Sequence, residues 1–277
     1  MQSSLRSVVL AISCLPLLIS PTNGEITKFV RFQAGDQTHY GIIEEDQIRK
    51  ISGDLFGKWK KTDTLFDSDS VKILVPTEAR KVLALAGNYR DHLGDDPIPT
   101  QPEPFFKLHT CLIADGEKIV QPSDHEQVHY EAEVVIVIGK KAKNVTEADA
   151  LKYVLGITCG NDISARYWQS NDRQWWRAKG SDTFGPCGPY IVAGLNYDNL
   201  DMELRVNGEV RQKTNTKNMI FNIAQTVSFI SRYVTLEPGD LIFSGTPGKT
   251  KPMKNGDVVE VEIEGVGVLT NQLVGAK

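Results

Sequence analysis

The stretch Tyr130-Glu131-Ala132-Glu133-Val134-Val135-Ile136-Val137-Ile138-Gly139 joins two carboxylates to a run of β-branched residues. Such a run predicts a β-strand. Because side chains alternate along a strand, Glu131 and Glu133 share one face, with Cα atoms about 6.6–6.8 Å apart. Two ionised carboxylates buried together on an apolar strand repel each other, and a divalent cation between them removes that cost. The alternative is an exposed strand end, where both glutamates are solvated.

A third carboxylate follows the next apolar segment. Residues 156–160 lead into Asn161 and Asp162, which places Asp162 where a strand ends and a turn begins, a common location for binding residues. Three carboxylates plus water suit a hard ion, so we expect Mg²⁺ first and Mn²⁺ or Ca²⁺ next. The alternative is that Asp162 caps a short helix over residues 164–169.

The rest of the chain predicts many strands and few helices. Asn207-Gly208 predicts the tight turn of a β-hairpin. Valine or isoleucine alternates with glutamate over residues 259–264, which predicts a strand with one buried face. Thr146 and Asn222 are expected to cap helices, the first of which runs through Val154. These patterns together predict an α+β, strand-dominated fold.

Composition excludes several classes of protein. The 277-residue chain has 31 Lys and Arg against 35 Asp and Glu, a net charge of −4. No domain-wide basic field follows from this balance, so we expect neither nucleic acid nor an anionic membrane as a partner. Four cysteines are too few for a disulfide scaffold. The sequence contains no CxxC pair, so a zinc site of that type is not expected.

The first 24 residues have the pattern of a secretory signal peptide. Arg6 precedes an apolar run over residues 8–19, and small residues at 22 and 24 suit a cleavage site. We therefore expect a secreted or periplasmic mature protein without a membrane segment; the alternative is a mis-assigned start on a cytoplasmic protein. Residues 25–76 predict a small N-terminal β-rich domain, within which the charged stretch Lys58–Ser70 is typical of a solvated connection. Residues 77–277 are expected to form the larger domain.

Short motifs follow one another in a fixed order over residues 80–274. They are Ala86-Gly87-Asn88-Tyr89-Arg90-Asp91-His92, Pro104-Phe105-Phe106-Lys107, Glu131-Ala132-Glu133, Asn161-Asp162-Ile163-Ser164-Ala165-Arg166, Trp168-Gln169, Ala178-Lys179-Gly180, Val206-Asn207-Gly208-Glu209, Met219-Ile220-Phe221, and Pro238-Gly239-Asp240 through Gly245-Thr246-Pro247. This ordered set resembles the fumarylacetoacetate hydrolase superfamily. The resemblance implies a mixed β-roll in a homodimer, with residues 25–76 as the N-terminal appendage that some members carry.

The resemblance also implies roles for individual residues. It implies that Glu131, Glu133 and Asp162 hold Mg²⁺ or Mn²⁺. Catalytic roles fall to Lys179, near the ion, and to His92, a lid histidine that pairs with an acid three residues later. That acid is Asp95 here, where acylpyruvate hydrolase-like members carry Glu, and Asp96 follows it. The residues implied to contact substrate are Lys107, Arg166, Gln169 and Thr246.

The implied function is a divalent-metal-dependent hydrolase of small anionic 2-oxo acids. Such an enzyme cleaves a C–C bond in β-diketo or acylpyruvate-type acids through a metal-stabilised enolate. An isomerase or decarboxylase of hydroxymuconate-like or oxaloacetate-like acids uses the same enolate and is the alternative. A non-catalytic protein that binds small diacids is a further alternative, which the presence of all three carboxylates, the lysine and the histidine disfavours.

Overall fold

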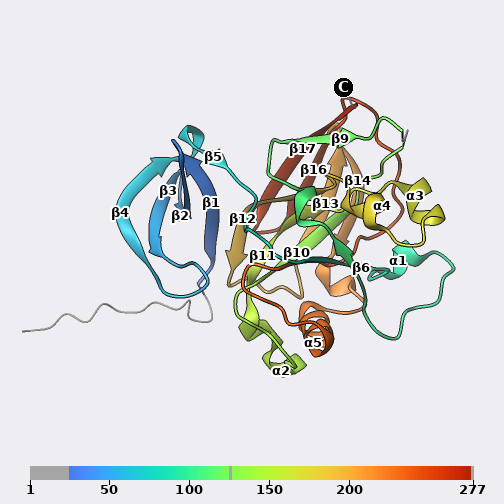
Figure 1. Cartoon of the computed structure of the whole chain (residues 1–277), viewed down its shortest axis with the longest axis horizontal. Coiled ribbons are helices and arrows are strands. Elements are labelled where there is room, and N and C mark those ends of the chain that lie inside the picture. Colours follow the sequence, from blue (N-terminus) through green and yellow to red (C-terminus); the bar gives the residue numbers. More distant parts are fainter. Residues whose placement is uncertain (1–24, 125–126, 276–277) are drawn as a thin grey trace, which may run out of the picture.

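A computed structural model describes residues 25–124 and 127–275 of the chain (Figure 1). The signal peptide predicted for residues 1–24 lies outside the described residues. Strands dominate the described ranges and form two sheets, which confirms the α+β, strand-dominated prediction. No helix in these ranges is long and apolar enough to cross a membrane.

The larger sheet has twelve strands. These are β1 (Thr27–Ala34), β2 (Gln37–Glu44), β3 (Gln47–Gly53), β4 (Trp59–Asp67), β5 (Lys72–Ile73), β6 (Val82–Ala86), β7 (Glu103–Lys107), β8 (Leu112–Ile113), β10 (Ala132–Ile138), β11 (Val154–Asn161), β12 (Gly185–Ala193) and β15 (Leu241–Phe243). The main path runs β4-β3-β2-β1-β12-β11-β10-β15-β6-β7, and β5 and β8 pair with β1 and β12. Strand β7 therefore forms one edge of this sheet.

The smaller sheet has five strands in the order β14-β13-β16-β17-β9. They are β9 (Lys118–Gln121), β13 (Asp201–Val206), β14 (Glu209–Asn215), β16 (Val258–Ile263) and β17 (Gly267–Gly275). Asn207 and Gly208 both have positive φ, 52° and 79°, as a tight hairpin turn between β13 and β14 requires. The predicted hairpin is confirmed, and so is the strand with one buried face, because Val259, Val261 and Ile263 are buried.

The N-terminal strands form an antiparallel meander that stands apart in Figure 1 but joins the larger sheet where β1 pairs with β12. The prediction of a solvated connection over Lys58–Ser70 is wrong for most of that stretch, because Trp59–Asp67 is strand β4. This strand lies at a sheet edge and pairs with β3 alone. Backbone hydrogen bonds hold it, and its charged side chains are typical of a protected edge.

Five short helices complete the described fold: α1 (Arg90–Leu93), α2 (Glu147–Ala150), α3 (Arg166–Asn171), α4 (Trp176–Gly180) and α5 (Ile223–Tyr233). Asn222 caps α5 through a capping box with Gln225, as predicted. The helix expected from Thr146 through Val154 is too long: α2 ends at Ala150, a 3₁₀ turn follows, and Val154 begins β11. Pairing of Val154 with Ile138 of β10 overrides the local helical preference there.

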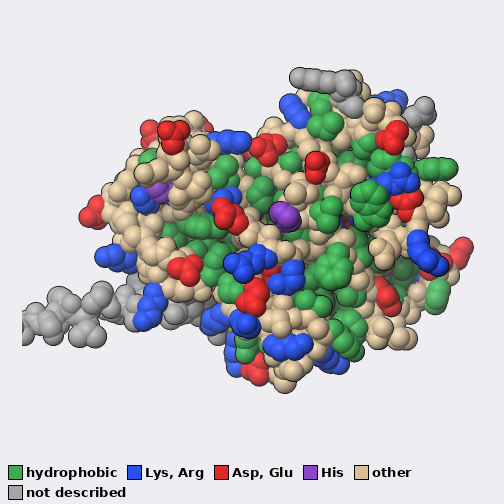
Figure 2. Space-filling model, in the orientation of Figure 1, with side chains coloured by type: hydrophobic (Ala, Val, Ile, Leu, Met, Phe, Trp, Pro, Cys, Tyr) green, Lys and Arg blue, Asp and Glu red, His purple; other side chains and the backbone are tan. Residues whose placement is uncertain are grey.

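Strand β10 is buried along its whole length, which explains its unbroken apolar sequence. Val134, Ile136 and Ile138 belong to the main hydrophobic core, and Val135 and Val137 belong to a second cluster on the other face. The carboxylates of residues 131 and 133 therefore enter the interior at the beginning of a rigid central strand. On the surface, acidic, basic and hydrophobic side chains are intermixed over the face seen in Figure 2.

Candidate metal centre and active site

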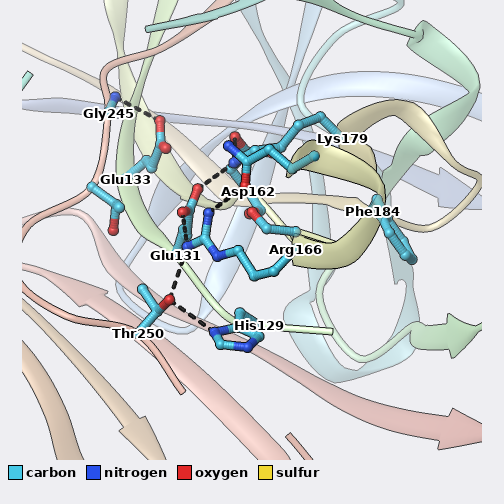
Figure 3. Close-up of polar contacts among 12 residues, drawn as sticks. His129, Glu131, Glu133, Asp162, Arg166, Lys179, Phe184, Gly245 and Thr250 are labelled. Carbon is cyan, nitrogen blue, oxygen red and sulfur yellow. Dashed lines mark hydrogen bonds and ion pairs between the residues drawn. The ribbon is translucent and has the colours of Figure 1, made fainter. Parts of the chain in front are cut away.

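Three carboxylates converge at the start of β10 and the end of β11 (Figure 3). Glu131, Glu133 and Asp162 each offer an oxygen within 4.8 Å of the others, and their exposed fractions are 3%, 1% and 1%. The antiparallel register places Ala132 opposite Asn161, and the backbone N–H of Asp162 donates to the carbonyl of Glu131 at 2.9 Å. Burial excludes a solvated strand end. The role of helix cap is also excluded for Asp162, because α3 begins only at Arg166.

Three cations surround two of these carboxylates. Lys179 Nζ donates to Glu131 Oε2 at 2.5 Å and to Asp162 Oδ2 at 2.8 Å. Lys107 Nζ donates to Asp162 Oδ1 at 2.6 Å, and Arg166 donates to Glu131 Oε1. Glu133 has no such ion pair among the described residues; its Oε2 accepts the backbone N–H of Gly245 at 2.7 Å.

The unequal pairing separates the pKa values of the two glutamates. Burial favours the protonated form of both. For Glu131 the charges of Lys179, Arg166 and His92 outweigh burial and lower its pKa to about 2. For Glu133, burial and the neighbouring charges of Asp162 and Glu131 raise the pKa well above its ordinary value. Glu133 is therefore a buried carboxylate whose ionised form needs a further cation.

The donor set fits a divalent metal ion. Oxygen ligands from three carboxylates are those that hard ions such as Mg²⁺, Mn²⁺ and Ca²⁺ prefer. An ion shared by Glu131, Glu133 and Asp162 would supply the positive charge that Glu133 lacks, and no rearrangement of the strands is needed to bring the three oxygens together. We conclude that these residues could hold a divalent cation, as the sequence predicts.

The turn after β15 completes this end of the site. Gly245 has φ +91°, and a Cβ there would lie 2.8 Å from the Cβ of Asn88, so only glycine fits while its N–H faces Glu133. Gln212 Nε2 donates to Thr246 Oγ1 at 2.9 Å and to the carbonyl of Pro247 at 2.6 Å. The turn is therefore held in place from the smaller sheet.

A cavity of about 330 Å³ opens next to the three carboxylates. Six residues predicted for the site line it: His92, Glu131, Glu133, Gln169, Lys179 and Thr246. The ring of His92 is fixed by a 2.6 Å hydrogen bond between Nδ1 and the carbonyl of Gly248, and its Nε2 lies 3.9 Å from Glu131 Oε1. The structure thus brings His92 and two of the three carboxylates, Glu131 and Glu133, to one cavity.

Four predicted residues lie outside the lining, namely Asp95, Lys107, Asp162 and Arg166. Lys107 was expected to contact substrate, but its side chain is fully buried and its ammonium donates to Asp162, the carbonyl of Lys179 and the carbonyl of Phe184. All three N–H donors of Lys107 therefore have partners within the chain, and its contact with a substrate stays a prediction. Arg166 donates to Oε1 of Gln169, which does line the cavity, at 2.7 Å. Asp95 is exposed, whereas its neighbour Asp96 lines the cavity.

Sequence reasoning missed part of the cavity wall. Glu103, Phe105 and Trp175 line the cavity, and the rings of Phe105 and Trp175 pack edge to face at 5.0 Å between centroids. A signal was present, because Glu103, Phe105 and Lys107 alternate along β7 and must share one face. Thr250, whose Oγ1 accepts from Arg166 at 2.8 Å, carried no recognisable signal.

Comparisons with known proteins identify the family of the chain. The fumarylacetoacetate (FAA) hydrolase C-terminal family model matches residues 81–274, and the Rv2993c-like N-terminal model matches residues 27–76. The crystal structure of 2-hydroxyhepta-2,4-diene-1,7-dioate isomerase from Mycobacterium marinum superimposes with a TM-score of 0.85 at 37% identity, covering 90% of this chain and 98% of that one.

Two further relatives are similar to the chain. The structure of 5-carboxymethyl-2-hydroxymuconate delta-isomerase from Mycobacterium smegmatis has a TM-score of 0.85 at 38% identity, covering 90% of this chain and all of that one. The oxaloacetate tautomerase FAHD2A, mitochondrial, of Bos taurus is 38% identical over 219 residues, covering 74% of this chain and 70% of that protein. With its strand-dominated fold and its buried acidic triad, the chain belongs to the fumarylacetoacetate hydrolase family.

Proposed function

We propose that the chain is a divalent-metal-dependent hydrolase that cleaves a C–C bond in β-diketo or acylpyruvate-type 2-oxo acids. The observation that carries the proposal is the convergence of Glu131, Glu133 and Asp162 beside a cavity that His92 also lines. A divalent cation held by these carboxylates would supply Lewis-acid stabilisation to the carboxylate and 2-oxygen of such a substrate.

The charges around the site favour an anionic substrate head. Three carboxylates are opposed by the three cations Lys107, Lys179 and Arg166, so their formal charges cancel. With a divalent cation the centre would carry a net charge of about +2. Such a centre would stabilise a substrate carboxylate and one negative charge that develops on the substrate's 2-oxygen. Lys179 lies in the cavity wall and would add to this stabilisation.

His92 is the base that the geometry supports. The carbonyl of Gly248 can only accept a hydrogen bond, so Nδ1 of His92 must carry the proton. In the neutral ring Nε2 is then the free acceptor, and it lies on the side of Glu131. His92 Nε2 can take a proton from a water molecule in the cavity without help from Asp95.

Two side chains are arranged to donate to the substrate. Thr246 Oγ1 accepts from Gln212, which leaves its own hydroxyl proton free to donate into the cavity. Gln169 Oε1 accepts from Arg166, so its amide N–H groups are the part that remains for a ligand. Phe105 and Trp175 form an apolar wall that limits access of further water.

The proposed reaction balances as the addition of one water molecule. His92 accepts a proton from water, and the hydroxide adds to the 4-carbonyl carbon of a 2,4-dioxo acid. The C3–C4 bond then breaks, its electron pair moves toward the 2-oxygen, and C3 receives a proton. Acetylpyruvate would give acetate and pyruvate.

The test is turnover of acetylpyruvate by purified protein with Mg²⁺, in which pyruvate and acetate are identified by NMR. We expect the His92→Ala variant to lose hydrolysis and the His109→Ala variant, whose residue is exposed and outside the cavity lining, to retain it. The proposal would be contradicted if pyruvate still formed in the presence of a chelator, or if the Glu131→Ala variant still formed it.

Isomerisation is the second candidate, and two observations favour it. Three relatives carry isomerase or tautomerase names, and Asp95 does not line the cavity to assist His92 in activating water. An isomerase or tautomerase needs only proton transfer within the substrate. Proton exchange at C3, or keto–enol conversion of oxaloacetate, without release of pyruvate from acetylpyruvate would favour this candidate over hydrolysis.

A further inference from the structure

The cavity has opposite electrostatic character at its two ends. At its inner end lie Glu131 and Glu133 of the three-carboxylate centre, with Lys179 and Thr246. Its outer end carries the carboxylates of Asp96 and Glu103, both exposed residues, which we call the acidic rim. At the volume of about 330 Å³, which is small for a ligand site, a substrate bound at the inner end must place its other end near this rim.

Strand β7 fixes part of this arrangement. Glu103, Phe105 and Lys107 share one face, and burial increases along it from exposed Glu103 to buried Lys107. Lys107 contacts Asp162 at the inner end, so Glu103 lies about 13 Å further out along an edge strand. Phe105 contributes an apolar ring between the two charges. The wall therefore passes from cation to aromatic ring to anion.

The lining offers no free cation for a second substrate carboxylate. Among the described residues that line the cavity, Lys179 is the one lysine, and arginine is absent. Its ammonium already pairs with Glu131 and Asp162 at the inner end. Sites built for a dicarboxylate place a cation at each end of the ligand, because a carboxylate that leaves water unpaired loses its hydration.

We propose that the acidic rim of Asp96 and Glu103 selects against a second carboxylate, so the substrate is a 2-oxo monocarboxylic acid with a neutral, largely apolar remote end. The inference rests on the proposed function only in placing the 2-oxo acid head at the metal centre. It separates this chain from relatives whose printed names include a dioate or oxaloacetate. Because both rim carboxylates are exposed, each changes the preference by about threefold to tenfold.

The experiment compares matched ligands that differ by one charge. Binding is measured by calorimetry with Mg²⁺ for 2-oxoglutarate and its 5-methyl ester, and turnover for succinylpyruvate and its terminal methyl ester. We expect wild-type protein to prefer each ester. The Glu103→Gln variant should raise the ratio of diacid to ester, in binding and in turnover, by about threefold to tenfold. The Asp96→Asn variant is used in the binding arm and should shift it in the same direction.

The matched control is Asp91→Asn, which removes a charge from α1 outside the cavity lining and should leave the ratio of diacid to ester unchanged. Equal or stronger binding of the diacids by wild-type protein overturns the inference, and so does a Glu103→Gln variant with an unaltered ratio. If the protein binds the esters more tightly but turns over none of the ligands, the inference is supported and the proposed hydrolysis is contradicted. If it turns over the substrates but prefers the diacids, the proposed hydrolysis is supported and the inference is contradicted. Failure of every 2-oxo acid to bind contradicts both.

Discussion

Replacing Glu133 with Gln removes one negative charge from the metal centre while it keeps the packing of the side chain. The carboxylate is buried, accepts one backbone N–H and has no ion pair among the described residues. A glutamine has nearly the same shape, can still accept from Gly245, and removes the repulsion with Glu131 and Asp162. We expect the metal-free variant to be at least as stable as the metal-free wild type, although it has lost one ligand.

The size of the effect follows from mass action. Mg²⁺ at one hundred times its dissociation constant stabilises a folded protein by about 2.7 kcal/mol. For a chain of this size, each kcal/mol shifts Tm by about 2–4 °C, so the wild type should gain about 5–11 °C. The Gln variant, with a neutral amide in place of one of three carboxylates, should lose most of that gain.

The assay is thermal unfolding with and without Mg²⁺, after chelator treatment. The exposed carboxylate of Glu147 on α2 offers a matched control, and its Gln variant should keep the full Mg²⁺ response. A Glu133→Gln variant that Mg²⁺ stabilises as strongly as the wild type would refute the reasoning, as would a metal-free variant several degrees less stable than wild type.

Three further predictions concern stability. The Lys107→Met variant removes one of the two lysine partners of buried Asp162 and the ammonium donor to the carbonyls of Lys179 and Phe184, and should lower the free energy of unfolding by about 3–5 kcal/mol in urea denaturation; a change below 1 kcal/mol would contradict this. Asn222→Ala removes the capping box of α5 and should lower it by about 1 kcal/mol, with the Mg²⁺ response intact. Because burial and the charges of Asp162 and Glu131 raise the pKa of Glu133 in the folded state, the metal-free protein should lose stability as pH rises from 4.5 through that raised pKa; urea denaturation across pH should show this loss in the wild type and not in Glu133→Gln.

The core of the site could be predicted from the sequence because it depends on local regularities. Period-two alternation places Glu131 and Glu133 on one face, and an apolar run ending at Asp162 places the third ligand at a strand end. Antiparallel pairing of β10 with β11 then brings the three together. The hairpin at Asn207-Gly208 was equally predictable, since only a few residue pairs adopt its backbone conformation.

The contacts that the sequence could not reveal join segments that are distant along the chain or depend on backbone pairing. Lys107 is occupied by the carbonyls of residues 179 and 184, which lie more than 70 positions away. His92 finds its partner in the carbonyl of Gly248, 156 positions away, and a backbone acceptor has no sequence signature. Strand β4 has charged, exposed side chains and is held by backbone pairing with β3, so hydrophobic periodicity could not reveal it.

The most direct measurement of the central claim is the position of a bound ion. Crystals soaked in Mn²⁺ would be measured at a wavelength where manganese scatters anomalously. We predict one strong peak within about 2.0–2.3 Å of an oxygen from each of Glu131, Glu133 and Asp162, absent from Glu133→Gln crystals. A Mn²⁺ peak elsewhere, with none between these three carboxylates, would contradict it.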